Sequence, residues 1–180
     1  MANNILPFKG ALPSIDPSVF LAPTATVIGD VEIGAESNIW FGCLVRGDMN
    51  IIRIGKRVNI QDLTVVHVDS QKYGTFIGDS VTIGHSAVIH ACTLEDRSFV
   101  GMQACVMDGA VVETGAMVAA GALVPPGKRV LAGQLWAGTP ARYVRDCGDQ
   151  ENQMIDRVPP EYWEMAQEYL KIGIGVVGKN

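Results

Sequence analysis

A cluster of basic residues, a long apolar segment and a closely spaced cysteine pair are all missing from this sequence of 180 residues. Its 14 basic and 19 acidic residues give a formal net charge of -5, which argues against a nucleic-acid-binding protein. Residues 1–12 lack the apolar run of a secretory signal, and no later stretch is long enough to span a membrane. We therefore expect a cytoplasmic protein with no nucleic-acid partner and no membrane partner.

The four cysteines, at positions 43, 92, 105 and 147, match no Cys-x-x-Cys metal or redox motif. We interpret them as buried free thiols that act as small apolar residues. Cys92 lies two residues after His90, so it stays a minor alternative to the histidines as a metal ligand.

The sequence instead contains a long repeat of six residues. An α-helix cannot keep residues six apart on one face for this long. A hexapeptide β-helix can, because each unit gives a short strand and a corner, and three units complete one triangular coil. We predict an all-β protein, a left-handed parallel β-helix over residues 13–135 within a single domain of residues 1–180. The inward aliphatic residues are Ile15, Leu21, Val27, Ile33, Ile39 and Val45, then Ile54, Ile60 and Val66, then Ile77, Ile83 and Ile89, then Leu94, Val100, Val106, Val112, Val118, Val124 and Val130.

Three interruptions break the repeat. The inward residues Val45 and Ile54 are separated by three residues more than the regular spacing of six, and Val66 and Ile77 by five more. Ile89 and Leu94 are separated by one residue fewer. Insertions in a solenoid form loops on one face, which is often the binding face. We expect the functional site near these steps.

The repeat ends near Val130, and Gly138-Thr139-Pro140 is typical of a turn. Residues 159–172 then predict a helix, because Pro159 and Pro160 suit a first turn and apolar residues follow on one side. We expect this helix to pack on the outside of the prism.

All three histidines of the chain fall within one 24-residue window. His67 and His90 each directly follow the inward residue of the third face, so they occupy the same slot one coil apart. His85 lies on the second face, too far from this pair to bind the same ion within one chain. It would reach the ion of a neighbouring subunit if its second face packed against the third face of that neighbour. A closed three-fold assembly repeats such a contact, which predicts a homotrimer. Three imidazoles with open positions are typical of a catalytic metal site, whereas three unrelated polar histidines would not explain the matching slots.

Two further polar residues occupy the equivalent positions one coil earlier. Arg46 precedes His67 on the third face, and Asp62 precedes His85 on the second. They are expected to meet across the subunit interface as an ion pair that stabilises the trimer. Gln61 precedes Asp62, and Asp48 lies two residues after Arg46, so both are candidates for the surroundings of the metal.

With the motifs Arg46-Gly47-Asp48 and Asn59-Ile60-Gln61-Asp62 and the three histidines in order, the sequence resembles the gamma-class carbonic anhydrases of the hexapeptide-repeat superfamily. The resemblance covers residues 15–130 and the turn at 138–142. It implies that His67 and His90 bind the metal from one subunit and His85 from the next. The metal of that family is Zn²⁺, Fe²⁺ or Co²⁺, its Arg and Asp residues at these motifs serve the trimer interface, and its Gln helps to position water and substrate.

The reaction implied by the resemblance is the reversible hydration of CO2 to bicarbonate by a metal-bound hydroxide. The sequence departs from the family at two points, which favours low activity. Met49 stands where the best-studied type has a glutamate, and the short segment from His67 to His85 offers no shuttle glutamate. Relatives with this short segment often place a tyrosine of the C-terminal helix near the site. Tyr169 is the first match here, with Tyr162 as its rival.

Two other functions remain open. A hexapeptide acyltransferase shares this prism and uses a single histidine as general base, so the paired slots of His67 and His90 argue against it. A catalytically silent trimeric assembly module would keep the histidines for structure alone. A metal assay tests the first alternative, and a CO2 hydration assay tests the second.

Overall fold

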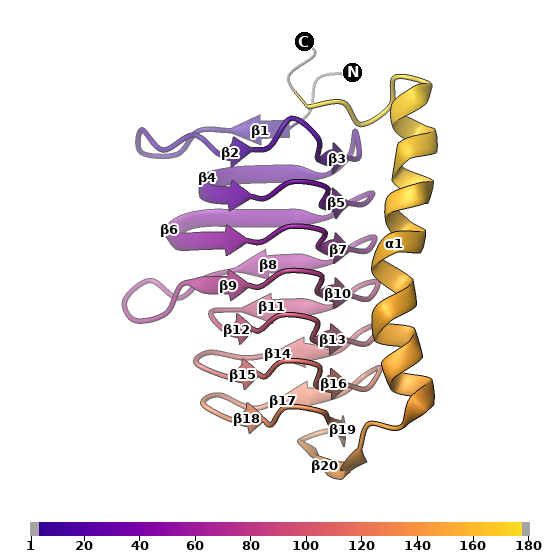
Figure 1. Cartoon of the computed structure of the whole chain (residues 1–180). Helices are drawn as coiled ribbons and strands as arrows, with labels where there is room; N and C mark the ends of the chain where they lie inside the picture. The colour runs from indigo at the N-terminus through magenta and orange to yellow at the C-terminus, as the bar shows by residue number, and fades with distance from the viewer. Residues whose placement is uncertain (1–3, 178–180) are drawn as a thin grey trace.

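The computed structural model describes residues 4–177, which form a column of stacked parallel coils with one long helix alongside (Figure 1). Strands of neighbouring coils pair in parallel, and equivalent residues keep one register through the column. The first face consists of β2 (Ser14–Ile15), the later parts of β4 (Thr26–Ile33) and β6 (Leu44–Ile54), β9 (Thr75–Ile77), β12 (Thr93–Leu94), β15 (Val111–Val112) and β18 (Arg129–Val130).

The other two faces are built in the same way. The second face consists of β3 (Phe20–Leu21), β5 (Asn38–Ile39), β7 (Asn59–Ile60), β10 (Thr82–Ile83), β13 (Phe99–Val100), β16 (Met117–Val118) and β19 (Gln134–Gly138). The third face consists of β1 (Asn4–Leu6), the early parts of β4 and β6, β8 (Val65–His67), β11 (Val88–His90), β14 (Cys105–Val106) and β17 (Leu123–Val124).

The six-residue series fills the interior of the prism. Every aliphatic residue of the predicted series from Leu21 to Val130 is at most 4% exposed, and equivalent members pair across coils. The predicted parallel β-helix is therefore confirmed. One insertion forms the expected loop, since residues 68–74 project beyond the coils between β8 and β9 (Figure 1), whereas the insertion between Val45 and Ile54 forms no loop and lies within the continuous strand β6.

The helix α1 (Asp149–Lys171) begins at Asp149, so the prediction that it starts at Pro159 was wrong. Both prolines lie inside the helix. Its first turn is stabilised by Glu151, which accepts a hydrogen bond from the Gly148 backbone N–H at 2.8 Å and pairs with Arg145 at 2.9 Å. These contacts satisfy an N-terminal amide and start the helix without proline.

The helix packs along the second face, in contact with β3, β5, β7 and β10. At the levels of these strands, the second face therefore lies under α1. The corner that follows this face stays accessible, and it carries Asp62 and His85, which are 34% and 39% exposed. Within residues 4–177, no helix is both long and apolar enough to cross a membrane.

On the second face, each end of the column is covered by a strand or segment that runs antiparallel to it. At one end, β20 (Ala141–Asp146) runs antiparallel to β19 after the turn at residues 138–140. At the other end, Gly175 accepts a hydrogen bond from the Leu21 backbone N–H at 3.0 Å, and Val176 bridges to Phe20 in the antiparallel sense. The terminal coils thus do not present a free parallel strand edge on the second face.

The inward ladder is expected to carry the stability of the fold. Ile83→Ala removes a fully buried side chain and should lower the free energy of unfolding by about 2–5 kcal/mol, because a cavity remains. Thr93→Ala, at an outward position of the first face, should change it by no more than about 0.5 kcal/mol. Denaturant unfolding at fixed protein concentration measures both, and equal losses would contradict the assigned facing of the two residues.

Candidate metal site

His67 and His90 lie side by side on the third face, at the ends of β8 and β11. Their backbones are register partners in the parallel pair, as the slot count predicted. His67 Nδ1 and His90 Nε2 face each other at 3.2 Å, and the ring centroids are 5.2 Å apart. The fold thus brings two imidazole nitrogens to one point on the prism surface.

The outer nitrogen of each ring contacts a carboxylate. His67 Nε2 lies 3.1 Å from Asp48 Oδ1, and His90 Nδ1 lies 2.5 Å from Asp108 Oδ1. Asp48 also pairs with Arg46 of the same chain. Burial raises the pKa of Asp48, but the hydrogen bonds from Arg46 and His67 outweigh burial, and the pKa lies below its ordinary value. Asp48 is therefore ionised at neutral pH.

This pairing decides what fits between the rings. A nitrogen that donates its proton to a carboxylate leaves the other nitrogen of that neutral ring with a lone pair. The two inner nitrogens of His67 and His90 then face each other as acceptors, which is favourable only with a cation between them. Two nitrogens bound to one tetrahedral zinc ion at about 2.05 Å lie about 3.3 Å apart, close to the observed separation. The two histidines therefore fit as ligands of one divalent ion.

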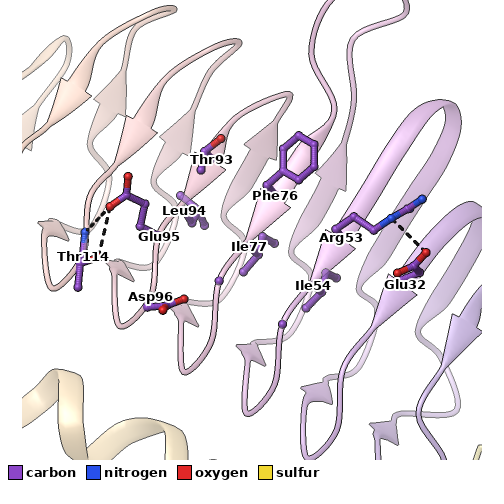
Figure 2. A pocket seen from close by; sticks show the side chains of 12 residues that line it. Glu32, Arg53, Ile54, Phe76, Ile77, Thr93, Leu94, Glu95, Asp96 and Thr114 are labelled. Atoms are coloured by element: carbon purple, nitrogen blue, oxygen red, sulfur yellow. Dashed lines mark hydrogen bonds and ion pairs between the residues drawn. The ribbon is translucent and has the colours of Figure 1, made fainter.

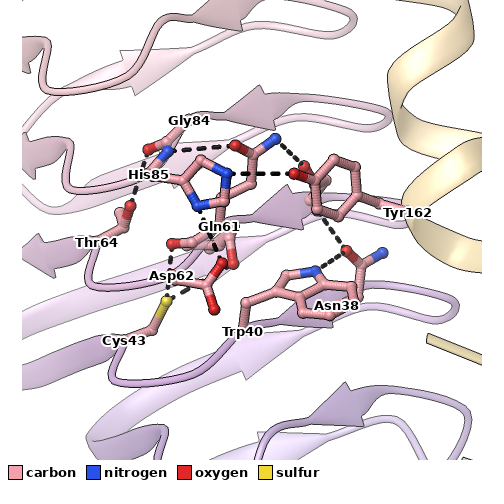
Figure 3. Close-up of polar contacts among 11 residues, drawn as sticks. Asn38, Trp40, Cys43, Gln61, Asp62, Thr64, Gly84, His85 and Tyr162 are labelled. Atoms are coloured by element: carbon pink, nitrogen blue, oxygen red, sulfur yellow. Dashed lines mark hydrogen bonds and ion pairs between the residues drawn. The ribbon is translucent and has the colours of Figure 1, made fainter. Parts of the chain in front are cut away.

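His85 lies on the corner after β10, where its ring lies between Asp62 and Tyr162. His85 Nδ1 is 2.9 Å from Asp62 Oδ2, and His85 Nε2 is 3.3 Å from the Tyr162 hydroxyl (Figure 3). A proton on Nδ1 that is donated to Asp62 leaves the lone pair of a neutral imidazole on Nε2. No three His, Cys, Asp or Glu side chains converge as a metal-binding group within the described part of one chain.

Gln61 is buried beside His85, and its amide is held at both ends. The His85 backbone N–H donates to Gln61 Oε1 at 3.2 Å, and Gln61 Nε2 donates to Asn59 Oδ1 at 2.9 Å (Figure 3). Asn59 donates in turn to Asn38, which also accepts from Trp40 Nε1 at 2.8 Å. This row of buried amides fixes the orientation of Gln61 and leaves its second N–H available. The sequence motif gave Gln61, but the buried Asn38 carried no recognisable signal.

The tyrosine of α1 that reaches a histidine is Tyr162 rather than Tyr169. Tyr169 packs against Phe20, Trp40 and Phe41, with ring centroids 5.6–5.9 Å apart, and belongs to an aromatic cluster. Burial and the nearby charge of Asp62 raise the pKa of Tyr162, so its hydroxyl stays protonated near neutral pH. Which tyrosine lies level with His85 depends on where α1 begins along the column. The sequence prediction placed this start too late, and so favoured the later tyrosine.

All four cysteines are free thiols, as predicted, but only Cys43 and Cys92 are buried, whereas Cys105 and Cys147 are partly exposed. Cys92 is 2% exposed, and burial raises its pKa above the ordinary value. Burial also raises the pKa of Cys43 to about 12. Thiols of this kind stay protonated and do not compete with imidazoles for a metal ion.

Two hollows of similar size differ in what they adjoin. A groove of about 580 Å³ between α1 and the second face is lined by Gln61 and Tyr162 at one end and by Phe99, Met117 and Met154 beyond them. A hollow of about 500 Å³ lies on the first face, where the charged side chains already have partners (Figure 2). Only the first hollow adjoins the histidine corner.

The chain is similar to known carbonic anhydrases. It is 48% identical over 162 residues to the mitochondrial gamma carbonic anhydrase 1 of Arabidopsis thaliana, which covers 87% of this chain but only 59% of that longer protein. It is 41% identical over 165 residues to a carbonic anhydrase of Geobacillus kaustophilus, covering 92% of this chain and 90% of that one. A solved hexapeptide transferase family protein from Anaplasma phagocytophilum superposes with a TM-score of 0.90 at 44% identity, covering 94% and 99% of the two chains. No protein-family model matches.

Proposed function

We propose that this chain, which belongs to the gamma carbonic anhydrase family, hydrates CO2 reversibly to bicarbonate at metal sites between the subunits of a homotrimer. The observation that carries the proposal is the pair of inner nitrogens of His67 and His90, which face each other at 3.2 Å while the outer nitrogen of each ring contacts a carboxylate. The third ligand in our proposal is His85 of a neighbouring subunit. We expect the protein to act in the cytoplasm, although the Arabidopsis relative is named as mitochondrial.

The exposed surface of the third face supports the subunit contact. Its outward residues form an apolar column beside the histidines, and no helix covers this face in the described part of the chain. The column is continuous in register and consists of Leu44, Val65, Val88, Cys105 and Leu123. A neighbour that seats its Asp62–His85 corner against this column would bury the apolar surface and bring the third imidazole to the metal. A head-to-tail contact of this kind closes into a ring of three.

A divalent ion held by these imidazoles would lower the pKa of a water molecule towards about 7 and so supply hydroxide at neutral pH. Imidazole ligands suit zinc, iron and cobalt alike, so Zn²⁺, Fe²⁺ and Co²⁺ all remain candidates. In our proposal the second N–H of Gln61 donates to an oxygen of CO2 or bicarbonate, and the Tyr162 hydroxyl lines the same groove beside His85. Arg46 and Asp62 are proposed to pair across the interface, where Arg46 would also keep its contact with Asp48.

The acyltransferase alternative has one supporting observation, the similarity in fold to a hexapeptide transferase family protein. An acyltransferase that uses one histidine as general base does not account for a second imidazole facing the first from the adjacent coil. A silent assembly module would bind metal without hydrating CO2, so the rate of hydration separates it from the enzyme.

Complementation between two inactive variants tests the proposal directly. His85→Ala chains keep the His67–His90 pair, and His90→Ala chains keep His85, so neither homotrimer has a complete site. Co-expressed in equal amounts, they should form mixed trimers in which about a quarter of the interfaces combine both intact halves. We expect metal content and CO2 hydration of the mixture to reach about a quarter of the wild-type values for random assembly.

Elemental analysis and stopped-flow CO2 hydration measure the outcome, with each variant expressed alone as control. A mixture as inactive and as metal-free as the two single variants would contradict a site shared between subunits. Full metal content in either variant alone would show that its histidine is not a ligand.

A further inference from the structure

We infer that Asp108 is a positioning residue that holds His90 in its metal-binding orientation and strengthens its hold on the ion. The inference rests on the proposed metal site and assigns a role to a residue that none of the sequence motifs includes. It concerns a contact within one chain, so it does not depend on how subunits are arranged.

The contact is short and well placed. Asp108 Oδ1 lies 2.5 Å from His90 Nδ1, on the side of the ring opposite the nitrogen that faces His67. An acceptor at Nδ1 fixes the proton there and leaves the lone pair on Nε2, which is the atom that a metal ion would bind. Asp48 does the same for His67 at 3.1 Å. The two rings are thus held from outside by two carboxylates, with their free nitrogens turned towards one point.

Asp108 reaches His90 from the next coil along the column. Ile89 pairs with Val106 in register, and the Gly109 N–H donates to the Ala91 carbonyl at 2.7 Å, which keeps the same offset and places Asp108 opposite Ala91. Asp108 therefore lies one position beyond the residue opposite His90, and its carboxylate reaches back diagonally to His90 Nδ1. The register changes by one residue only at Thr93 and Val111, so the shortened step falls after this contact.

The backbone of Asp108 is held on both sides. The Gly127 N–H donates to the Asp108 carbonyl at 2.8 Å. Gly109 has φ +66° and lies against the Tyr73 ring, where an added Cβ would come within 2.9 Å of the ring. The neighbouring coil and the loop at residues 68–74 therefore fix the corner from which Asp108 extends. A fixed carboxylate restricts rotation of His90 more than a mobile one would.

Two substitutions separate orientation from charge. Asp108→Asn keeps an oxygen that can accept from His90 Nδ1–H but removes the negative charge, whereas Asp108→Ala removes both. Loss of such an outer partner typically weakens metal affinity about 10- to 100-fold, and we expect the lower end for Asn and the upper end for Ala. The probe is Co²⁺ added to metal-free protein, with affinity measured by competition with a chelator and ligand geometry followed by the visible absorption of the ion.

Asp156→Asn is the matched control, because Asp156 is an exposed carboxylate on α1 that pairs with Arg97 away from the histidines. Sedimentation of all variants checks that the trimer and fold are retained. Wild-type affinity and spectrum in Asp108→Ala would overturn the inference while leaving the proposed metal site intact. Failure of the wild-type protein to bind Co²⁺ at all would overturn the proposed function instead.

Discussion

Replacing His90 or His85 with alanine is expected to remove the metal ion and reduce CO2 hydration to the uncatalysed background, while the β-helix stays folded. Either change leaves only two imidazoles at each site, and two neutral ligands hold a divalent ion too weakly to survive dialysis. The inward aliphatic ladder stabilises the fold, and neither histidine belongs to it, since both are partly exposed on the prism surface.

Elemental analysis, stopped-flow hydration and circular dichroism measure the three expected results. Thr93→Ala serves as control, because it truncates an outward side chain of the same solenoid on the first face. Retention of one ion per subunit in either histidine variant would exclude that histidine as a ligand. Loss of the folded state would mean that the site is a structural clamp and not a surface feature of an independently stable prism.

Val88→Asp is expected to dissociate the trimer and, with it, to empty the metal sites. Val88 lies in the middle of the apolar column on the third face and is 37% exposed in the single chain. A carboxylate buried there without a partner costs several kcal/mol, which is enough to shift assembly strongly towards monomers. The matched control is Val111→Asp, the same substitution at an outward position of the first face, which should keep the trimer.

Sedimentation at several protein concentrations and metal analysis of the same samples decide this prediction. The proposal requires that trimer and metal be lost together in Val88→Asp and kept together in Val111→Asp. A metal-loaded Val88→Asp monomer would show that one chain completes the site. Dissociation by Val111→Asp alone would place the interface on the first face.

The fold was predictable because its inward pattern is redundant. Each face repeats the same aliphatic requirement in every coil, so a single atypical unit does not hide the period. The start of α1 was not predictable in this way. Pro159 and Pro160 favour a start at residue 159, but Glu151 and Arg145 stabilise an earlier first turn. Proline within a helix is the less common case, and the capping contact depends on a residue outside the helix.

The candidate site could be predicted only in part, for a similar reason. His67 and His90 share a slot, and counting along the repeat places them together without any knowledge of the coordinates. Asp108 is opposite Ala91 in the register, so the same arithmetic does not align it with His90. Its carboxylate reaches His90 diagonally, and this reach depends on the conformation of the Asp108 side chain, which counting along the repeat does not give.

The covered ends of the second face also affect how molecules of this protein can associate with one another. A prism of parallel coils has the same geometry at every level, so an open terminal coil would accept the first coil of another molecule as readily as its own next coil. Repetition of that event would give an endless fibre. The reversed strand β20 and the segment around Gly175 interrupt the pattern, because an antiparallel neighbour offers a different row of donors and acceptors. On the second face, the chain thereby disfavours end-to-end stacking and favours sideways association, which is the direction that completes the metal site in our proposal.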